Sequence, residues 1–426
     1  MTFQKYPEYK DSDVEWLGEM PGHWIRGSLK NLAWIRNGKD YKDVESSDGE
    51  YPVIGSGGMF SKASQYLHDG ESVLLGRKGT IDKPLYINGR FWTVDTMFYT
   101  EVAKGTSAKF LYYYALTIPF EFYSTSTALP SMTQGDLLNH PAAIPSNFEQ
   151  TQIARFLDHE TARIDALIEE QQRLIELLKE KRQAVISHAV TKGLDPTVPM
   201  KDSGAEWLGE VPAHWETLRI GAVYSEAADK GLAELPVLRV SIHHGVSDKE
   251  LSEEESDRKI TRIDDREKYK RVRPGDLVYN MMRAWQGGFG AVLVDGLVSP
   301  AYVVARPKNE DISRYVEQLL RTGCAVEEMR KNSYGITDFR LRLYWDQFKN
   351  IVIVIPPEVE RQQIMERIDS LINESEALKS EADRLIVILQ ERRSALISAA
   401  VTGKIDVRGW QPPARAQAPV LEAEAV

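Results

Sequence analysis

The chain has 426 residues, of which 42% are hydrophobic and 27% are charged, as in an ordinary soluble globular protein. This length is enough for about two to three domains. No apolar run approaches the length of a membrane span, and the first residues lack the apolar stretch of a signal peptide, so we expect a cytoplasmic protein. A single cysteine, Cys324, excludes an internal disulfide framework and a cysteine-based zinc cluster.

The formal net charge of -10 argues at first against nucleic acid, because phosphate contacts need lysine and arginine. The acidic excess, however, lies in the helical segments, the connecting segments and the tail, and each of the two globular stretches is close to neutral. Basic residues could therefore still line one face of each globule. We expect modest, salt-sensitive DNA binding by this chain alone.

The chain is a tandem repeat, which is visible in two blocks. Lys10–Trp24 returns as Lys201–Trp215, and both copies contain Glu-Trp-Leu-Gly-Glu followed by Pro-x-His-Trp. Ile144–Thr191 returns as Ile355–Thr402, and both copies share an Ile-Pro start, a Gln-Ile pair and a Val-Thr end. Between these blocks the copies diverge almost completely, which predicts a shared scaffold that holds two different binding surfaces.

These blocks divide the chain into consecutive predicted segments. They are a connector (1–24), a first globule (25–145), a long helix (146–193), a second connector (194–215), a second globule (216–355), a second long helix (356–404) and a tail (405–426). The tail is rich in Pro and Ala from Trp410 onward and is expected to be disordered.

The two long segments predict amphipathic helices. No glycine or proline occurs between Phe148 and Lys192, and apolar residues recur there at steps of three and four. Prolines stand where each helix can begin, and Gly193 and Gly403 stand where each can end. The predicted seam consists of Ile153, Phe156, Leu157, Ile164, Leu167, Ile168, Leu174, Ile175, Leu178 and Val185, and of Ile364, Ile368, Leu371, Ile372, Leu378, Leu385, Ile386, Leu389 and Leu396.

A helix of some 45 residues spans roughly 65–70 Å, and alone it would expose its apolar stripe. The simplest way to bury both stripes is an antiparallel coiled coil with pseudo-two-fold symmetry. The alternative is that each helix packs only on its own globule. We expect the connector at the N-terminus to pack near the far end of the second helix, which would make the order of segments ring-like.

Each globule mixes strand-like runs with Gly-rich turns, and polar side chains that can contact phosphates or base edges follow those runs. In both globules one group of candidates follows a strand and another lies in a later loop. The candidate DNA-binding residues of the first globule are Ser56, Lys62, Arg77, Lys78, Thr80, Ser131, Thr133 and Gln134. Those of the second globule are Asn280, Arg283, Gln286, Lys331, Ser333, Tyr334, Thr337 and Arg340. For any one of these residues, a solvated turn or a strand end is the more ordinary interpretation.

Motifs for catalysis are missing from the sequence. There is no Gly-rich phosphate loop ending in Gly-Lys-Ser/Thr, and no strand is followed by Asn-Pro-Pro-Tyr or Asp-Pro-Pro-Tyr, which a DNA amino-methyltransferase would need. The histidines are scattered, and His243-His244 lacks acidic partners at metal-ligand spacing. We therefore predict no catalytic residues, no metal site and no cofactor bound by this chain.

With its repeated connectors and helix starts, and with Leu277–Gly288 followed by Pro300-Ala301-Tyr302, the chain closely resembles the specificity (S) subunit of type I restriction–modification systems. The resemblance covers all but the tail. One departure is Arg361, which stands where the first helix has Gln150, so the second helix start is expected to dock differently.

The resemblance implies an α+β fold in which two α/β-type globular target-recognition domains are joined and separated by two long helices that form an antiparallel coiled coil. Each domain would read one half of a bipartite double-stranded DNA site, and the coiled coil would set the spacing. The chain would be non-catalytic. Two methyltransferase (M) subunits would dock on the helices, and two restriction (R) motor-nuclease subunits would join them. S-adenosylmethionine, ATP and Mg would bind to those partners, and no membrane would be involved.

Two other interpretations remain at this stage. The chain could be a structural adaptor whose globules bind proteins and not DNA, since the helices would look the same. It could also be an enzyme with an unrecognised site, although the missing motifs argue against that.

Overall fold

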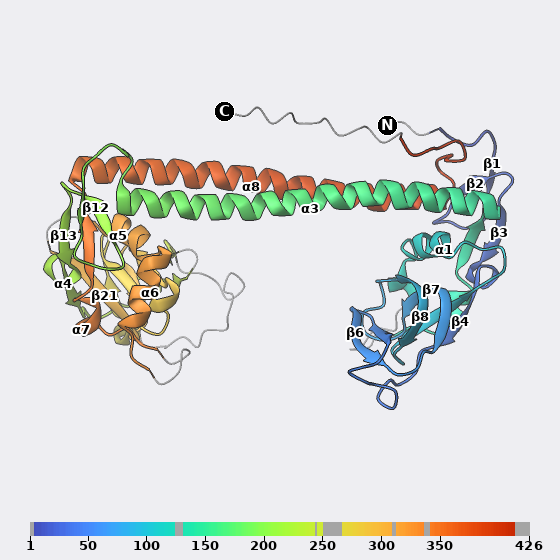
Figure 1. Cartoon of the computed structure of the whole chain (residues 1–426), viewed down its shortest axis with the longest axis horizontal. Helices are drawn as coiled ribbons and strands as arrows, with labels where there is room; N and C mark the ends of the chain where they lie inside the picture. Colours follow the sequence, from blue (N-terminus) through green and yellow to red (C-terminus); the bar gives the residue numbers. More distant parts are fainter. Residues whose placement is uncertain are drawn as a thin grey trace. The chain divides into compact units, whose positions relative to one another are not determined.

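The computed structural model describes residues 4–123, 131–242, 245–249, 266–308, 312–335 and 341–413. The chain forms two compact units, each assembled from a globular head and parts of the two long helices (Figure 1). Unit 1 comprises Met1–Gln172 and Asp383–Val426, and unit 2 comprises Arg173–Ala382. Unit 1 is thus discontinuous in sequence, whereas the predicted segments follow one another along the chain.

Both units mix helices with mostly antiparallel strands, so the predicted α+β class is confirmed. The first half of the chain contains β1 (Tyr9–Asp11), β2 (Glu19–Pro21), β3 (Ile25–Ser28), η1 (Leu29–Asn31), β4 (Ala33–Asn37), β5 (Tyr51–Gly55), β6 (Gly58–Ala63), β7 (His68–Gly76), β8 (Leu85–Thr93), β9 (Met97–Val102), α1 (Ala108–Ala115), η2 (Phe120–Tyr123), α2 (Gln134–Leu138), β10 (Pro141–Ile144) and α3 (Asn147–Lys192).

The second half repeats this order with additions. It contains β11 (Met200–Asp202), β12 (Glu210–Pro212), β13 (Glu216–Arg219), α4 (Ile220–Val223), β14 (Tyr224–Ala227), β15 (Val240–Ser241), β16 (Gly245–Val246), η3 (Arg266–Lys268), β17 (Lys270–Val272), β18 (Leu277–Asn280), η4 (Ala284–Gln286), β19 (Phe289–Ala291), β20 (Gly296–Val298), β21 (Tyr302–Pro307), α5 (Ser313–Leu320), α6 (Gly323–Lys331), α7 (Trp345–Phe348), β22 (Val352–Ile355) and α8 (Glu358–Val401).

The two heads share one sheet topology despite their different sequences. In unit 1 the strand order is β4-β9-β7-β8-β5-β6, and in unit 2 it is β14-β21-β18-β19. The first four strands correspond one to one, and in both heads they lie in the same chain order. Each head also has a short antiparallel pair, β3 with β10 or β13 with β22, whose second strand leads directly into a long helix. The repeat therefore extends into the regions where sequence similarity has vanished.

Helices α3 and α8 run antiparallel in each unit. In unit 1 the early residues Ile153 and Phe156 of α3 share a core with the late residues Ile397 and Val401 of α8. In unit 2 the late end of α3 packs against the early end of α8, since Ile186 and Val190 share a core with Ile364 and Ile368. The predicted antiparallel pairing is confirmed, and packing of each helix on its own globule alone is excluded.

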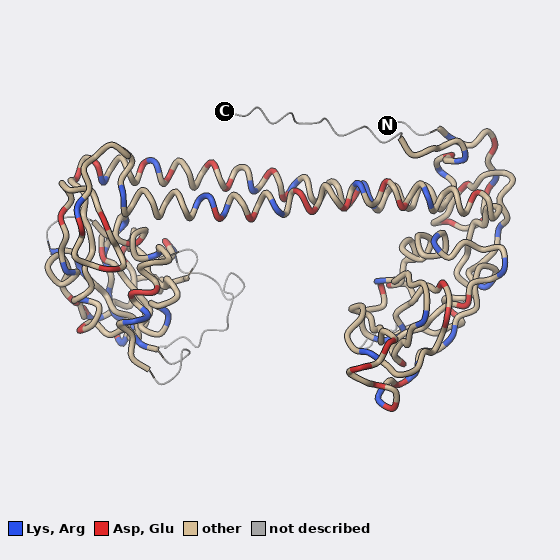
Figure 2. The backbone as a smooth tube through the Cα atoms, viewed as in Figure 1, with Lys and Arg blue, Asp and Glu red and all other residues tan. Residues whose placement is uncertain are grey.

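Two ion pairs between the helices obey the pseudo-two-fold repeat. In unit 1 the Arg393 guanidinium lies 2.8 Å from an Asp165 carboxylate oxygen, and in unit 2 Arg182 lies 2.8 Å from Glu376. Asp165 and Glu376 occupy equivalent positions of the two repeats, as do Arg182 and Arg393. Acidic and basic residues are interspersed along both helices (Figure 2), which provides cross-helix partners of opposite sign.

The seam prediction was wrong for four of its leucines. Leu167, Leu174, Leu378 and Leu385 are exposed, and 54% of Leu378 is accessible. The seam residues are buried near the helix ends, where the helices also contact a head. The four exposed leucines lie in the middle stretches of the helices. A single partner helix covers only a narrow stripe, so an apolar stripe wider than that contact stays partly accessible.

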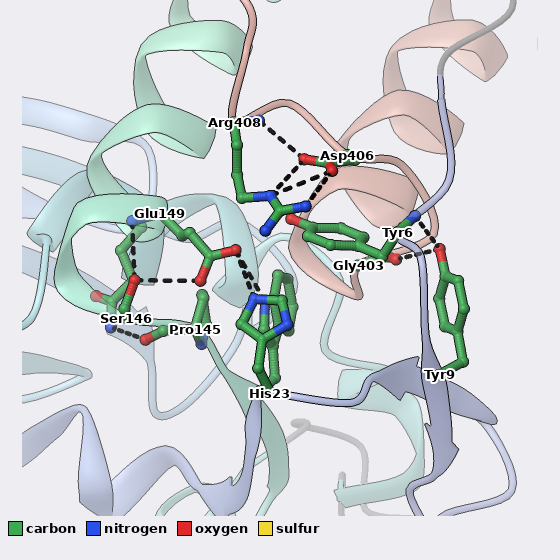
Figure 3. Close-up of polar contacts among 11 residues, drawn as sticks. Tyr6, Tyr9, His23, Pro145, Ser146, Glu149, Gly403, Asp406 and Arg408 are labelled. Carbon is green, nitrogen blue, oxygen red and sulfur yellow. Dashed lines mark hydrogen bonds and ion pairs between the residues drawn. The ribbon is translucent and has the colours of Figure 1, made fainter.

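The repeated connector clamps the start of each long helix in the same way. In unit 1, His23 Nε2 lies 2.9 Å from Glu149 Oε1, and the buried Trp24 indole donates to the same oxygen at 3.4 Å (Figure 3). In unit 2, the corresponding His214 and Trp215 contact Glu360 Oε2 at 2.6 and 3.0 Å. In both units the Pro-x-His-Trp motif therefore binds a glutamate in the first turn of the long helix.

The second helix start docks as the first does, contrary to expectation. Gln150 Nε2 donates to the Pro145 carbonyl at 3.0 Å, and Arg361 donates from its guanidinium to the equivalent Pro356 carbonyl at 3.3 Å. Both side chains are buried. Arginine and glutamine can both present an N–H at this distance from the helix axis, so the substitution preserves the contact.

The N-terminal connector packs against the end of α8, as predicted from the repeat. The Tyr9 hydroxyl donates to the Gly403 carbonyl at 3.1 Å (Figure 3). The Lys404 ammonium donates to the Leu17 carbonyl at 3.0 Å. The Asp406 amide also donates to the Gln4 carbonyl at 2.8 Å, so the segment before β1 pairs with the segment after α8. The helices end as expected, since Gly193 and Gly403 adopt φ values of 81° and 76°.

The prediction of disorder was wrong for the first residues of the tail. Val407 is buried in the core of unit 1, and the Trp410 ring lies 5.4 Å from that of Phe156. The Arg408 guanidinium binds Asp406 and lies 4.9 Å from the Tyr6 ring centre (Figure 3). The Pro- and Ala-rich composition predicted disorder, but these apolar residues pack into the core of unit 1. No helix within the described residues is long and apolar enough to cross a membrane.

Candidate nucleic-acid interface

In unit 1, the first group of candidates lies at the end of β7. The amides of Arg77 and Lys78 both donate to the Thr96 carbonyl, at 2.9 and 3.2 Å. The Arg77 guanidinium donates to the Asp95 carbonyl at 3.3 Å and lies over the Phe98 ring, which leaves it half-buried. Lys78 and Thr80 are exposed. The β8–β9 connection thus fixes the backbone of this turn, and Lys78 is its most accessible cation.

The structure brings the later loop of unit 1 to the same turn. Ser131 and Lys78 face each other in a β-bridge, and the Met132 amide donates to the Arg77 carbonyl at 3.0 Å. Thr133 is exposed, but its hydroxyl receives the Asp136 amide at 3.2 Å and donates to the Asp136 carboxylate at 2.6 Å, so it caps α2. Gln134 is the first residue of that helix. The structure thus brings the later candidate segment to the Arg77 turn, and it gives Thr133 a capping role that the sequence did not reveal.

Ser56 reaches the same region through the β8–β9 connection. The Val94 amide donates to the Ile54 carbonyl just before the β5–β6 turn that contains Ser56. Asp95 and Thr96, the next residues of that connection, hold the Arg77 turn. Lys62 is exposed on β6, the edge strand of the sheet. Ser56 is therefore indirectly linked to Lys78, whereas Lys62 lies farther out along the hairpin.

In unit 2, Asn280 ends β18 and is occupied within its own turn. Its Oδ1 accepts the Met282 amide at 3.0 Å, and its amide donates to the Gly288 carbonyl at 3.2 Å. The Trp285 indole donates to the Met282 carbonyl at 3.0 Å, and Gly287 completes the turn with a φ of 82°. The turn is consequently rigid, with Gln286 exposed and Arg283 half-buried.

The later candidates of unit 2 end α6 and join the same turn. Lys331 and Tyr334 are exposed, and the Ser333 hydroxyl donates to the Met329 carbonyl at 2.7 Å, which occupies it within the helix end. Tyr334 pairs with Arg342 through two backbone hydrogen bonds of 2.9 Å. One residue farther, the Leu343 amide donates to the Met281 carbonyl at 3.0 Å. Thr337 and Arg340 lie outside the described residues.

The two turns are equivalent parts of the repeat. Strand β7 corresponds to β18, and the hydrogen bond from Met132 to Arg77 corresponds to that from Leu343 to Met281. Each head thus pairs the end of its third sheet strand with a segment that precedes the last strand. The parallel placement of candidate loops that the sequence indicated is a real structural correspondence.

Arg239 was missed by the sequence and lies in the electrostatic environment of the unit 2 turn. Burial raises the pKa of Tyr302, and the charges of Arg239 and Arg283 and a hydrogen bond from Asn280 oppose that increase. The Lys270 ammonium donates to the Tyr302 carbonyl at 2.8 Å. Arg239, Arg283 and Lys270 therefore all interact with Tyr302. Only Arg283 is adjacent to a Gly-rich turn in the sequence, which is why the other two were not identified.

Across the described ranges, no group of three or more His, Cys, Asp or Glu side chains could hold a metal ion. A cluster in which the Arg306 guanidinium binds the buried Asp276 at 2.9 Å and Asp229 at 2.9 Å lies at the start of β18 and has a structural role.

Comparison with known proteins finds similarity to type I restriction enzyme specificity subunits. A family model described as type I restriction modification DNA specificity domain matches residues 21–178. The EcoDI specificity subunit of Escherichia coli is 26% identical over 175 residues, which are 41% of this chain and 39% of that protein. The MjaVIII specificity subunit of Methanocaldococcus jannaschii is 23% identical over 431 residues, with 95% and 92% coverage. For EcoDI, a Haemophilus influenzae relative and EcoprrI, the matches span only 39%, 38% and 41% of those proteins.

Solved structures show the same fold. The HsdS subunit of Thermoanaerobacter tengcongensis has a TM-score of 0.50 at 14% identity, with 91% of this chain and 98% of that chain covered. A chain from a study of complex assembly and conformational transition of the type I R-M system has a TM-score of 0.58 at 16% identity, with 90% and 98% covered.

These sequence likenesses and this shared fold all point to specificity subunits. Residues 21–178 match the type I restriction modification DNA specificity domain, and the chain is similar to type I specificity subunits, the family that its repeated motifs resemble. The alternative of an adaptor that does not bind DNA gains no support from these likenesses.

Proposed function

We propose that this chain is the non-catalytic DNA-specificity subunit of a type I restriction–modification complex, and that each head reads one half of a bipartite duplex target. The observation that carries the proposal is the pair of equivalent turns. Their backbones are fixed by the same hydrogen bond, yet one presents Lys78 and Ser131 and the other presents Met282 and Arg342. An identical frame with different side chains is what two readers of different sequences require.

The two helices suit a spacer between the half-sites. They contain 46 and 44 residues, each runs through both units, and cross-helix ion pairs occur in each unit. Readers on one duplex must be held at a fixed separation, because half-sites face the same side only at defined helical phases. A continuous helix pair provides that separation better than a flexible linker does.

The exposed leucines of these helices are the surface on which we place the two methyltransferase subunits. Leu167, Leu174, Leu378 and Leu385 occupy matching positions in the two repeats. A pseudo-symmetric apolar surface fits two copies of one partner. The partners would supply the chemistry in the cytoplasm, with S-adenosylmethionine, ATP and Mg bound to the methyltransferase and motor-nuclease subunits and none bound to this chain.

A head exchange tests the proposal. Residues 25–143 are replaced by the corresponding globule of a relative with a different target, and the complex with its methyltransferase subunits is expressed in cells. Sequencing of methylated adenines is expected to show one altered half-site and one unchanged half-site. Replacement of residues 216–355 is the matched control and should alter the opposite half. A change in both halves, or in neither, would contradict the modular reading.

A labelling experiment tests the non-catalytic assignment. The purified chain is incubated with target DNA and labelled S-adenosylmethionine, alone and with its methyltransferase subunits. Label is expected in DNA only in the presence of those subunits. Incorporation by the chain alone would show that it holds an active site.

A further inference from the structure

Met282 stands out because a rigid turn presents an apolar side chain to solvent. Its side chain is 46% exposed, whereas both of its backbone polar groups are satisfied inside the protein. Asn280 Oδ1 accepts its amide at 3.0 Å, and the Trp285 indole donates to its carbonyl at 3.0 Å. The turn therefore holds the backbone of Met282 in one conformation and leaves its thioether arm accessible.

The surroundings of Met282 are polar and cationic. Arg283 follows it directly, and the hydrogen bond from Leu343 to Met281 brings the exposed Arg342 to the neighbouring segment. Gln286 of the same turn is exposed as well. The turn thus combines an exposed apolar side chain with exposed or half-exposed arginine and glutamine side chains, which is not the composition of a protein core. It is the pattern that reads a base pair carrying a methyl group beside hydrogen-bonding edges in the major groove.

The equivalent position in unit 1 has a different chemistry. Lys78 corresponds to Met282, since each follows the carbonyl that accepts the matching amide, from Met132 or from Leu343. Lys78 is exposed and lies opposite Ser131 in a β-bridge. One head thus offers an ammonium and a hydroxyl where the other offers a thioether and a guanidinium. A position that is fixed in backbone and variable in side chain is suited to determine specificity.

We propose that Met282 is a specificity-determining residue of the second head and contacts the C5-methyl group of a thymine in the major groove of its half-site. Asn280 and Trp285 are positioning residues that act through Met282. This inference rests on the proposed function. It adds that this turn recognises a thymine methyl group. The second half-site must therefore contain at least one thymine.

The experiment removes the methyl group from DNA and the side chain from the protein separately. The target is first mapped from methylated adenines with the complete complex. Each thymine of the second half-site is then replaced by deoxyuridine, which lacks only the C5-methyl group, and the binding of the complex is measured. At one position deoxyuridine should weaken binding by wild type about fourfold, the effect of one buried methyl group. Met282→Ala should bind the thymine and deoxyuridine duplexes equally.

Two sets of variants separate contact from structure. Leu293→Ala removes another exposed apolar side chain of the same head and should retain the fourfold dependence. Asn280→Asp keeps the oxygen that accepts the Met282 amide and should also retain it, whereas Asn280→Ala should lose it. Loss of the dependence in Asn280→Asp would contradict the positioning role.

The outcomes distinguish this inference from the proposed function. If the complex methylates no split motif, the proposed function fails. If the motif is split but no deoxyuridine position couples to Met282, or if the second half-site has no thymine, only this inference fails. Reduced copurification of a methyltransferase subunit with Met282→Ala, without any change in base dependence, would show that the residue serves a protein contact and would overturn the inference.

Discussion

Gly403 provides a quantitative test of the contact between the N-terminal connector and the end of α8. It follows the end of α8 with a φ of 76°, and Gly193 follows the end of α3 with a φ of 81°. The left-handed backbone alone penalises alanine at either position by about 1–2 kcal/mol. The two glycines differ in their surroundings, so they form a matched pair.

The surroundings predict a larger loss at Gly403. A Cβ there would lie 2.5 Å from Pro21 Cγ, even closer to Pro21 Cδ, and 3.2 Å from the Trp24 ring. At Gly193 the nearest atoms would be Glu360 Oε1 at 3.1 Å and the Trp215 ring at 3.3 Å. Overpacking of this severity costs about 1–3 kcal/mol. We therefore expect Gly193→Ala to cost about 1–2 kcal/mol and Gly403→Ala about 2–5 kcal/mol in total.

Scanning calorimetry of the full chain measures both variants. A loss of 1 kcal/mol lowers the midpoint of a unit of this size by about 2–4 °C. Gly403→Ala should therefore lower the transition of unit 1 more than Gly193→Ala lowers that of unit 2. Addition of Pro21→Ala to Gly403→Ala should bring the loss back to that of Gly193→Ala. Equal losses in the two single variants, or no rescue by Pro21→Ala, would refute the placement of the connector over the end of α8.

Three further predictions concern the helix pair, a buried histidine and the turn of unit 1. Reversal of the exposed pair Asp165–Arg393 in a double-mutant cycle should give a coupling free energy of about 0.2–1 kcal/mol. This coupling should disappear in molar salt, and a coupling free energy that does not depend on salt would contradict a surface ion pair. Burial lowers the pKa of His140 to about 4, below about 6.5 in the unfolded chain, so its contribution to stability is complete above pH 6.5 and is lost as pH falls toward 4. His140→Phe should therefore flatten the dependence of the urea midpoint on pH between 4 and 6.5, and an unchanged dependence would assign it to other groups. Lys78→Ala should reduce the slope of log affinity against log salt by about one for DNA bound to the complex, and an unchanged slope would exclude a phosphate contact by Lys78.

The repeats made much of the fold predictable from sequence. The connector motif and the helix start both recur in the sequence, and in the structure each copy of the His-Trp motif contacts the glutamate of its own helix start. Glycine after a long apolar periodicity marked both helix ends, because few other residues adopt a left-handed backbone. These features depend on local chemistry, which a sequence displays directly.

Individual roles in the candidate interface were less predictable, because they depend on which polar groups the fold itself uses. Thr133 and Asn280 have side chains suited to base edges, yet one caps a helix and the other closes a turn. Met282 was not selected, since an exposed methionine cannot be distinguished from a buried one without tertiary contacts. Similarly, the first residues of the tail find a core that composition does not reveal.

The account depends above all on two different heads that read one duplex at a fixed separation. Genome-wide mapping of methylated adenines in cells that carry the chain with its methyltransferase subunits tests this directly. The account predicts one motif with two short specified parts separated by a gap of constant length. A continuous motif, a gap of variable length or the absence of any motif that depends on this chain would contradict it.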